Sequence, residues 1–242
     1  MCRISNLYGF NVSDNIKYTG GNTPIFEVKS LIPGIMMFSY SMLMLIAALL
    51  ISKDKTSSFL KRLYTSPMKS HNYIIGYFVP FMIVGLVQSI ICIILGYIFG
   101  ATSGTGFVSF GESLLLILEM LPMMFINIFI GMILATLLNE KSAPAVTSIF
   151  ISLSGIIGGA WMPLETMGDF EKVAECLPFY PSVYLGRIIT NATHTVPDSL
   201  GNPVYYSFSD RGLMFLLILL GYLTIFGALT VLFFNKRLKN DC

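Results

Sequence analysis

The sequence predicts an all-α membrane protein with a bundle of about five transmembrane helices. Of its 242 residues, 55% are hydrophobic and only 12% are charged, and the mean hydropathy is +0.75. Soluble domains carry about twice that share of charge. A helix needs roughly 20 apolar residues to cross about 30 Å of hydrocarbon. Runs that reach or approach this length cover residues 31–52, 73–100, 113–138, 145–161 and 212–234.

The apolar runs are continuous, whereas strands of a membrane barrel alternate in polarity over about ten residues. The runs therefore predict helices, of which the fourth is the shortest. We assign residues 31–242 to one transmembrane domain and residues 1–30, which are polar, to an extracellular N-terminal segment.

The distribution of Lys and Arg predicts the orientation, because short loops rich in these residues stay in the cytoplasm. The loop after the first run and the C-terminal tail are both basic, and alternation of the helices places them on one side, together with Lys141. We therefore expect a multi-pass plasma-membrane protein with a cytoplasmic C-terminus. The basic residues of the loop and tail are Lys53, Lys55, Lys61, Arg62, Lys69, Lys236, Arg237 and Lys239.

We predict a short amphipathic helix in the loop between the first two runs, which Thr56 or Ser57 can cap and Ser66-Pro67 can end. Its apolar face holds Phe59, Leu60, Leu63 and Tyr64, and its polar face holds Lys61 and Arg62. Such a helix lies along the membrane surface. It is either an ordinary interfacial helix or an element on which a partner docks.

A second amphipathic pattern follows Trp161-Met-Pro163 on the predicted outer side. Leu164, Met167 and Phe170 recur at helical spacing, and the pattern continues to Leu177 before Pro178 and Pro181 end it. We predict an extracellular amphipathic helix there. It serves either as a solvated cap or, with these three side chains, as a substrate gate.

Three side chains with an amide or carboxyl group fall within the apolar runs: Gln88, Glu119 and Asn127. Polar groups inside a membrane are costly, so they line a route or hydrogen-bond between helices. Glu119 is the only charged residue in any of the runs. It lies in a substrate pathway, or near the headgroups if the outer turns of its helix project beyond the hydrocarbon.

Two pairs of glycines have the spacing that lets membrane helices approach closely. They are Gly96 with Gly100 and Gly155 with Gly159. We treat both pairs as candidate helix-packing positions.

Catalytic and cofactor motifs are absent from the sequence. There is no phosphate-binding Gly-x-x-x-x-Gly-Lys-Ser/Thr loop, so any ATP that drives this protein binds to another chain. The four cysteines show no paired spacing and both histidines fall in loops, which predicts no metal site. A net charge of +2 gives no reason to expect nucleic acid. We predict a protein that is not an enzyme.

The order of several short motifs resembles the ABC-2 type transporter permeases. These motifs are Ile32-Pro-Gly-Ile35, Leu60-Lys-Arg-Leu63, Tyr73-Ile-Ile-Gly-Tyr77 and Gly159-Ala-Trp-Met-Pro-Leu164. The resemblance spans residue 30 to the C-terminus. Such permeases typically have six membrane helices, so we expect the first helix to be missing, through truncation or in a true five-helix variant.

The resemblance implies the membrane subunit of a bacterial ABC exporter. It implies a second permease, forming a homodimer or a heterodimer, and cytosolic ATP-binding subunits that hold the ATP and Mg. The cytoplasmic loop helix would couple the chain to the ATP-binding subunit through Lys55, Phe59, Leu60, Lys61, Arg62, Leu63 and Tyr64.

The expected substrate is a hydrophobic or amphiphilic small molecule, such as a drug or antibiotic, since permeases of this style commonly export such molecules. Two alternatives stay open: export of a lipid-linked polysaccharide or glycoconjugate, and a truncated accessory subunit that does not transport. An intramembrane enzyme is disfavoured because no convergent catalytic set is present.

Overall fold

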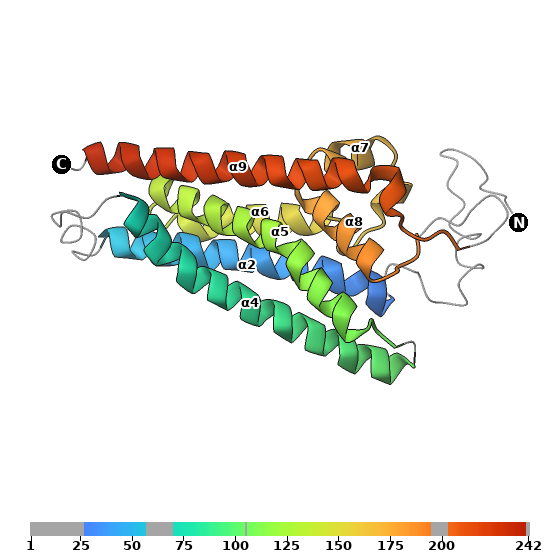
Figure 1. Ribbon diagram of the computed structural model, residues 1–242. Helices are drawn as coiled ribbons and strands as arrows, with labels where there is room; N and C mark the ends of the chain where they lie inside the picture. The colour runs from blue at the N-terminus through green and yellow to red at the C-terminus, as the bar shows by residue number, and fades with distance from the viewer. Residues whose placement is uncertain (1–26, 57–69, 105, 195–202, 241–242) are drawn as a thin grey trace, which may run out of the picture.

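The computed structural model describes residues 27–56, 70–104, 106–194 and 203–240. Within these ranges the chain forms seven α-helices and a short 3-10 helix, and the only β pairing is an isolated antiparallel bridge between Thr193 and Tyr205. The all-α class is therefore confirmed (Figure 1). The elements are α2 (Val28–Thr56), α4 (Ser70–Ser103), α5 (Phe110–Leu137), α6 (Ala143–Ile157), η2 (Leu164–Thr166), α7 (Asp169–Glu175), α8 (Phe179–Ile189) and α9 (Phe208–Asn240).

Four helices of the described chain, α2, α4, α5 and α9, are long and apolar enough to cross a membrane. Helices α2, α5 and α9 run in one direction along the bundle, and α4 runs in the opposite direction (Figure 1). The C-terminal ends of α2 and α9 lie at one end, and the beginnings of α2 and α9 lie at the other together with α8. The basic ends of α2 and α9 thus share one end, as the orientation predicted from five crossings requires.

The fourth predicted crossing, over residues 145–161, corresponds to a shorter helix in the structure. The helix there, α6, is 15 residues long and ends at Ile157, which gives about 22 Å of helix and falls short of the hydrocarbon thickness. Gly158 follows as the C-cap, and Gly159 has a φ of +63°, a left-handed conformation that stops an α-helix. The apolar run therefore contains a helix and a turn, and hydropathy does not distinguish the two.

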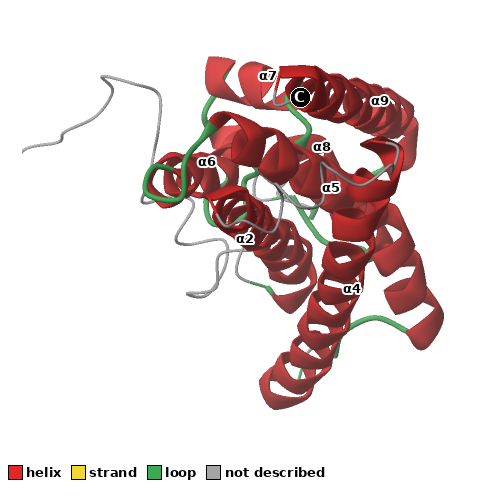
Figure 2. Ribbon diagram, turned by 90° about the vertical axis from the view of Figure 1, so that its left-hand side faces the viewer, coloured by secondary structure: helices red, strands yellow, loops and turns green. Residues whose placement is uncertain are grey.

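Helix α2 packs against four other helices, α4, α5, α6 and α8 (Figure 2). Its fully buried positions recur every three or four residues, which is the spacing of one helical face. Membrane helices associate through close packing of this kind because lipid tails are as apolar as the side chains. These positions are Met36, Met37, Tyr40, Leu43, Ala47 and Ala48.

Hydroxyl groups link α2 to its neighbours inside the bundle. The Tyr40 hydroxyl lies 2.6 Å from Ser89 Oγ on α4, and Ser154 Oγ on α6 lies 2.8 Å from Ser41 Oγ. All four side chains are shielded from the surroundings of the protein. Such hydrogen bonds between membrane helices contribute about 0.6 kcal/mol each.

The closest approach of α2 and α5 occurs at Gly131. A Cβ atom at this position would lie 2.6 Å from the carbonyl oxygen of Met44 and 2.9 Å from the Ala47 side chain. Only a residue without a side chain fits this contact. Gly131 therefore determines how closely the two most buried of the four long helices pack.

The predicted extracellular amphipathic helix is interrupted in the structure. The 3-10 helix η2 and helix α7 replace it, and between them Gly168 has a φ of +57°. As predicted, the helical pattern ends before Pro178, since α7 ends at Glu175, but a new helix, α8, begins directly afterwards at Phe179. Proline is tolerated in the first turn of a helix, where its missing N–H would have had no partner. The eight residues from Tyr180 to Arg187 are all buried.

We expect Gly131→Ala to lower the free energy of unfolding by about 1–3 kcal/mol, because the added methyl group collides with the α2 backbone. The measurement is thermal unfolding of the detergent-solubilised protein. Gly221→Ala on α9 is the matched control, since its Cβ would meet no atom within 4 Å. An equal effect of both substitutions would contradict the close approach.

Candidate functional site

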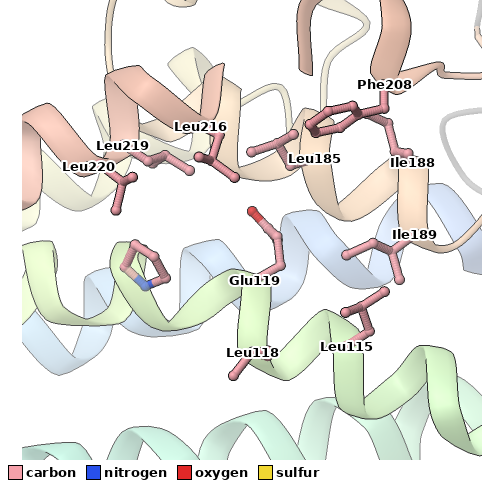
Figure 3. A pocket seen from close by; sticks show the side chains of 11 residues that line it. Leu115, Leu118, Glu119, Leu185, Ile188, Ile189, Phe208, Leu216, Leu219 and Leu220 are labelled. Atoms are coloured by element: carbon pink, nitrogen blue, oxygen red, sulfur yellow. The ribbon is translucent and has the colours of Figure 1, made fainter. Parts of the chain in front are cut away.

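An apolar cavity of about 500 Å³ lies between α5, α8 and α9 (Figure 3). This volume is within the range of small-molecule sites, about 300–1,000 Å³. Apart from one carboxylate, every side chain that lines the cavity is apolar. The lining residues are Leu115, Leu118, Glu119, Pro122, Leu185, Ile188, Ile189, Phe208, Leu216, Leu219 and Leu220.

The three helices each contribute one face to this cavity. On α5 the lining residues are spaced i, i+3, i+4 and i+7, and on both α8 and α9 they include a set at i, i+3 and i+4. Residues with this spacing share one side of a helix. Leu115, Leu118 and Phe208 are each at least half exposed, so the cavity opens sideways between α5 and α9, where lipid would surround the protein.

The Glu119 side chain points from α5 into the space between α5 and the other two helices (Figure 3). Both of its carboxylate oxygens are buried, and neither has a hydrogen-bond partner among the described residues. A carboxylate in such surroundings costs several kcal/mol unless it is neutralised or paired. Glu119 is therefore the one chemically distinctive group of the cavity.

The other two predicted pathway residues do not line the cavity with Glu119. Asn127 is fully buried, and its side-chain amide donates to the Met123 carbonyl at 3.0 Å, while its own oxygen has no partner. Gln88 is half buried on α4 and its buried oxygen also has no partner among the described residues. The structure thus separates the three polar side chains.

The glycine pairs also differ from the prediction. A Cβ on Gly96 would lie 2.7 Å from the Phe107 ring, and one on Gly100 would lie 2.7 Å from the backbone of Gly106. These two glycines make room for the α4–α5 connection and not for a second helix of the described chain. Gly155 faces Phe38 of α2, whereas Gly159 lies beyond the end of α6.

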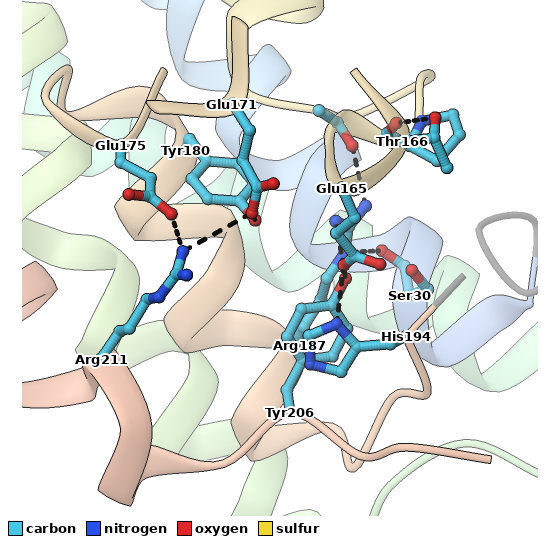
Figure 4. Close-up of polar contacts among 12 residues, drawn as sticks. Ser30, Glu165, Thr166, Glu171, Glu175, Tyr180, Arg187, His194, Tyr206 and Arg211 are labelled. Carbon is cyan, nitrogen blue, oxygen red and sulfur yellow. Dashed lines mark hydrogen bonds and ion pairs between the residues drawn. The ribbon is translucent and has the colours of Figure 1, made fainter. Parts of the chain in front are cut away.

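A buried polar network occupies the end of the bundle where α8 lies (Figure 4). Its centre is Arg187, which is only 2% exposed. The guanidinium donates to the carbonyls of Gly159 at 2.8 Å and Ser30 at 3.3 Å, and to the Tyr206 hydroxyl at 3.4 Å. Arg187 thereby joins the turn after α6, the beginning of α2 and the segment before α9.

Glu165 in η2 extends this network. It accepts a hydrogen bond from the Tyr206 hydroxyl, and His194 Nδ1 lies 3.0 Å from the same carboxylate oxygen. The His194 and Tyr206 rings stack with centroids 3.8 Å apart. Burial raises the pKa of Tyr206, against the opposing effect of Arg187, so its hydroxyl stays protonated as a donor. Among the described residues no group is placed to hold a metal ion.

A second set of ion pairs connects α7 to α9. Arg211 pairs with Glu175 and lies 3.6 Å from Glu171. Burial raises the pKa of Glu171 although the nearby Arg211 lowers it. The Tyr222 hydroxyl adds a hydrogen bond of 3.1 Å to the Cys176 carbonyl. Polar contacts thus hold α7 and the residue after it to α9.

Of the predicted gate residues, Leu164 is almost fully buried, while Met167 and Phe170 are exposed by 38% and 39%. The contacts that hold this region are polar and involve residues that apolar periodicity does not reveal, such as Arg187, His194, Tyr206 and Arg211. One signal was available in the sequence. Arg187 is a single basic residue within the otherwise uncharged stretch Phe179–Ile189.

At the opposite end, Lys55 in the last turn of α2 bonds within the chain. Its ammonium group donates to the carbonyls of Leu138 at 3.0 Å and Thr136 at 3.3 Å, which lie at the C-terminal end of α5, where positive charge is favourable. The other predicted coupling residues lie outside the described residues: Phe59, Leu60, Lys61, Arg62, Leu63 and Tyr64.

The helices and the lipid-facing cavity define a multi-pass α-helical membrane protein. The model of the ABC-2 family transporter proteins matches residues 3–235, and the chain belongs to this family. It is therefore a membrane transport component and not itself catalytic, in a family that generally works with an ATP-binding subunit. Searches among curated proteins and among solved structures gave no match.

We expect Arg187→Met to lower the free energy of unfolding by about 3 kcal/mol, because it leaves buried carbonyl groups without a donor. Thermal unfolding in detergent measures this. The control is Lys172→Met, which removes an exposed ion pair with Asp169 and should change stability by less than about 0.5 kcal/mol. Similar losses in both variants would exclude a structural role for the buried network.

Glu119→Leu should raise the free energy of unfolding by about 2 kcal/mol, because it removes a buried polar group that has no partner. Glu112→Leu, on the same helix, should have the opposite sign. Glu112 accepts from the Ser109 N–H at 2.8 Å in the capping box of α5. A loss of stability in Glu119→Leu would mean that the carboxylate is paired in the folded chain.

Proposed function

We propose that this chain is the transmembrane subunit of an ATP-driven exporter that moves a hydrophobic or amphiphilic small molecule outward across the membrane. The observation that carries the proposal is the cavity between α5, α8 and α9, which has an apolar lining and a sideways opening. A molecule dissolved in the bilayer can enter such a cavity without first crossing water.

The lining argues against a polysaccharide. A glycan exposes many hydroxyl groups, and each one that loses water without gaining a partner costs about 1–3 kcal/mol. The cavity offers a single polar side chain, Glu119. A hydrophobic molecule, such as a lipophilic drug or antibiotic, has no such penalty.

In this proposal the C-terminus is cytoplasmic, which places the basic ends of α2 and α9 beside the ATP-binding subunit. The loop from Lys55 to Tyr64 then couples ATP binding to helix movement. Lys55 supports this arrangement because its bonds to Thr136 and Leu138 join the end of α2 to the end of α5. A movement of the loop would thus reach α5, which carries Glu119. A second permease, identical or related, completes the transporter.

The test is transport by proteoliposomes that contain this chain and the ATP-binding subunit with which it co-purifies. We expect ATP-dependent movement of lipophilic dyes, and none with a non-hydrolysable nucleotide or with a catalytically inactive ATP-binding subunit. Equal movement with and without ATP hydrolysis would contradict the proposal, and so would transport restricted to glycoconjugates.

The coupling loop has its own test. Combining Phe59→Asp with Arg62→Glu should abolish co-purification of the ATP-binding subunit. The first substitution places a charge on the apolar face of the predicted loop helix, and the second reverses a charge on its polar face. The matched control is Asp169→Asn together with Lys172→Gln, which changes an exposed ion pair at the other end of the bundle. Undiminished association of the loop variant would refute this docking surface.

A further inference from the structure

We propose that the cavity between α5, α8 and α9 binds a hydrophobic cation, with the Glu119 carboxylate as its counter-ion. This deepens the proposed function, on which it rests, by naming the substrate class of the site. The structural feature behind it is a single acidic side chain that projects into an otherwise apolar space (Figure 3).

The carboxylate lacks a partner within the described chain. Both oxygens are buried and accept no hydrogen bond from the described residues. The other side chains that line the cavity are all apolar. An unpaired acid destabilises the bundle, and a hydrophobic residue at position 119 would pack there without this cost. A ligand that brings positive charge removes the cost when it binds.

The basic residues that are nearest in sequence to the cavity lining bind other partners and not Glu119. Helix α8 contributes Leu185, Ile188 and Ile189 to the cavity and carries one basic residue, Arg187. Its guanidinium donates to Ser30, Gly159 and Tyr206. On the α9 side, Arg211 pairs with Glu171 and Glu175. Neither guanidinium lines the cavity.

The remaining surfaces of the cavity suit the apolar part of such a ligand. Leucine, isoleucine, proline and phenylalanine side chains surround the carboxylate on three helices. An anion would meet repulsion from Glu119, and an uncharged ligand would leave the carboxylate unpaired. A cation whose charge is shielded by hydrocarbon satisfies both parts of the site.

The probe that tests this is tetraphenylphosphonium, whose positive charge lies inside four phenyl rings. Tetraphenylborate, which has nearly the same shape and the opposite charge, is the matched ligand. Each is measured separately by equilibrium dialysis against the purified full chain in detergent, without ATP or an ATP-binding subunit. The saturable component of binding is compared among the wild type, Glu119→Gln and Asp169→Asn.

We expect the wild type to bind tetraphenylphosphonium saturably and more tightly than tetraphenylborate. Glu119→Gln should weaken binding of the cation by about tenfold or more, the loss of one charge-assisted contact, and should narrow the preference between the two ions. Asp169→Asn removes an exposed carboxylate and should leave both affinities unchanged. Thermal unfolding of each variant verifies that it is folded.

Three results would overturn the inference. They are the absence of saturable cation binding by the wild type, equal affinity for the two ions, and unchanged cation affinity in Glu119→Gln. If Glu119→Gln leaves the affinity for the cation unchanged, the cavity would instead hold lipid acyl chains or uncharged substrates. Because the binding assay contains no ATP-binding subunit, ATP-driven export of uncharged dyes can persist when the inference fails. Conversely, cation binding without any ATP-driven export would contradict the proposed function alone.

Discussion

The structure depends on one constraint: polar groups in hydrocarbon must find partners inside the protein. The constraint explains why the described chain is helical and why the hydroxyls of Tyr40 and Ser41 meet Ser89 and Ser154 between helices. It also explains why the ammonium of Lys55 covers carbonyls at the end of α5. Each of these contacts replaces a hydrogen bond that the polar group would make to water outside the membrane.

Helix α8 shows how the same constraint shapes an irregular region. Helix α6 ends early at Gly158 and Gly159, and the chain then turns through η2 and α7 before it returns into the bundle as α8. The turn exposes backbone carbonyls, and Arg187 from α8 donates to one of them, the Gly159 carbonyl. A buried arginine is tolerated because backbone and hydroxyl acceptors surround it. The interruption of α6 and the basic residue of α8 thus compensate each other.

Glu119 departs from this rule. Its carboxylate is buried, faces an apolar cavity and has no partner among the described residues. Proteins accept such local costs mainly at functional sites, where an interaction with a ligand offsets them. The cavity lies between the long helices α5 and α9 and the short helix α8. It can therefore change shape if these helices move relative to one another.

The sequence by itself determined the membrane class, the helix runs and the location of the one carboxylate, because these follow from hydropathy and run length along the chain. It placed Lys55 in the loop after the first run, whereas the structure has Lys55 in the last turn of α2. It did not reveal where the helix ends within residues 145–161, since Gly158–Trp161 include no charged side chain that would interrupt the apolar run. Only the tertiary structure decided that Glu119 lies apart from Gln88 and Asn127, and that Arg187, Glu165, His194 and Tyr206 meet. These contacts join residues up to 157 positions apart, as Arg187 and Ser30 are, and local periodicity carries no information about such distances.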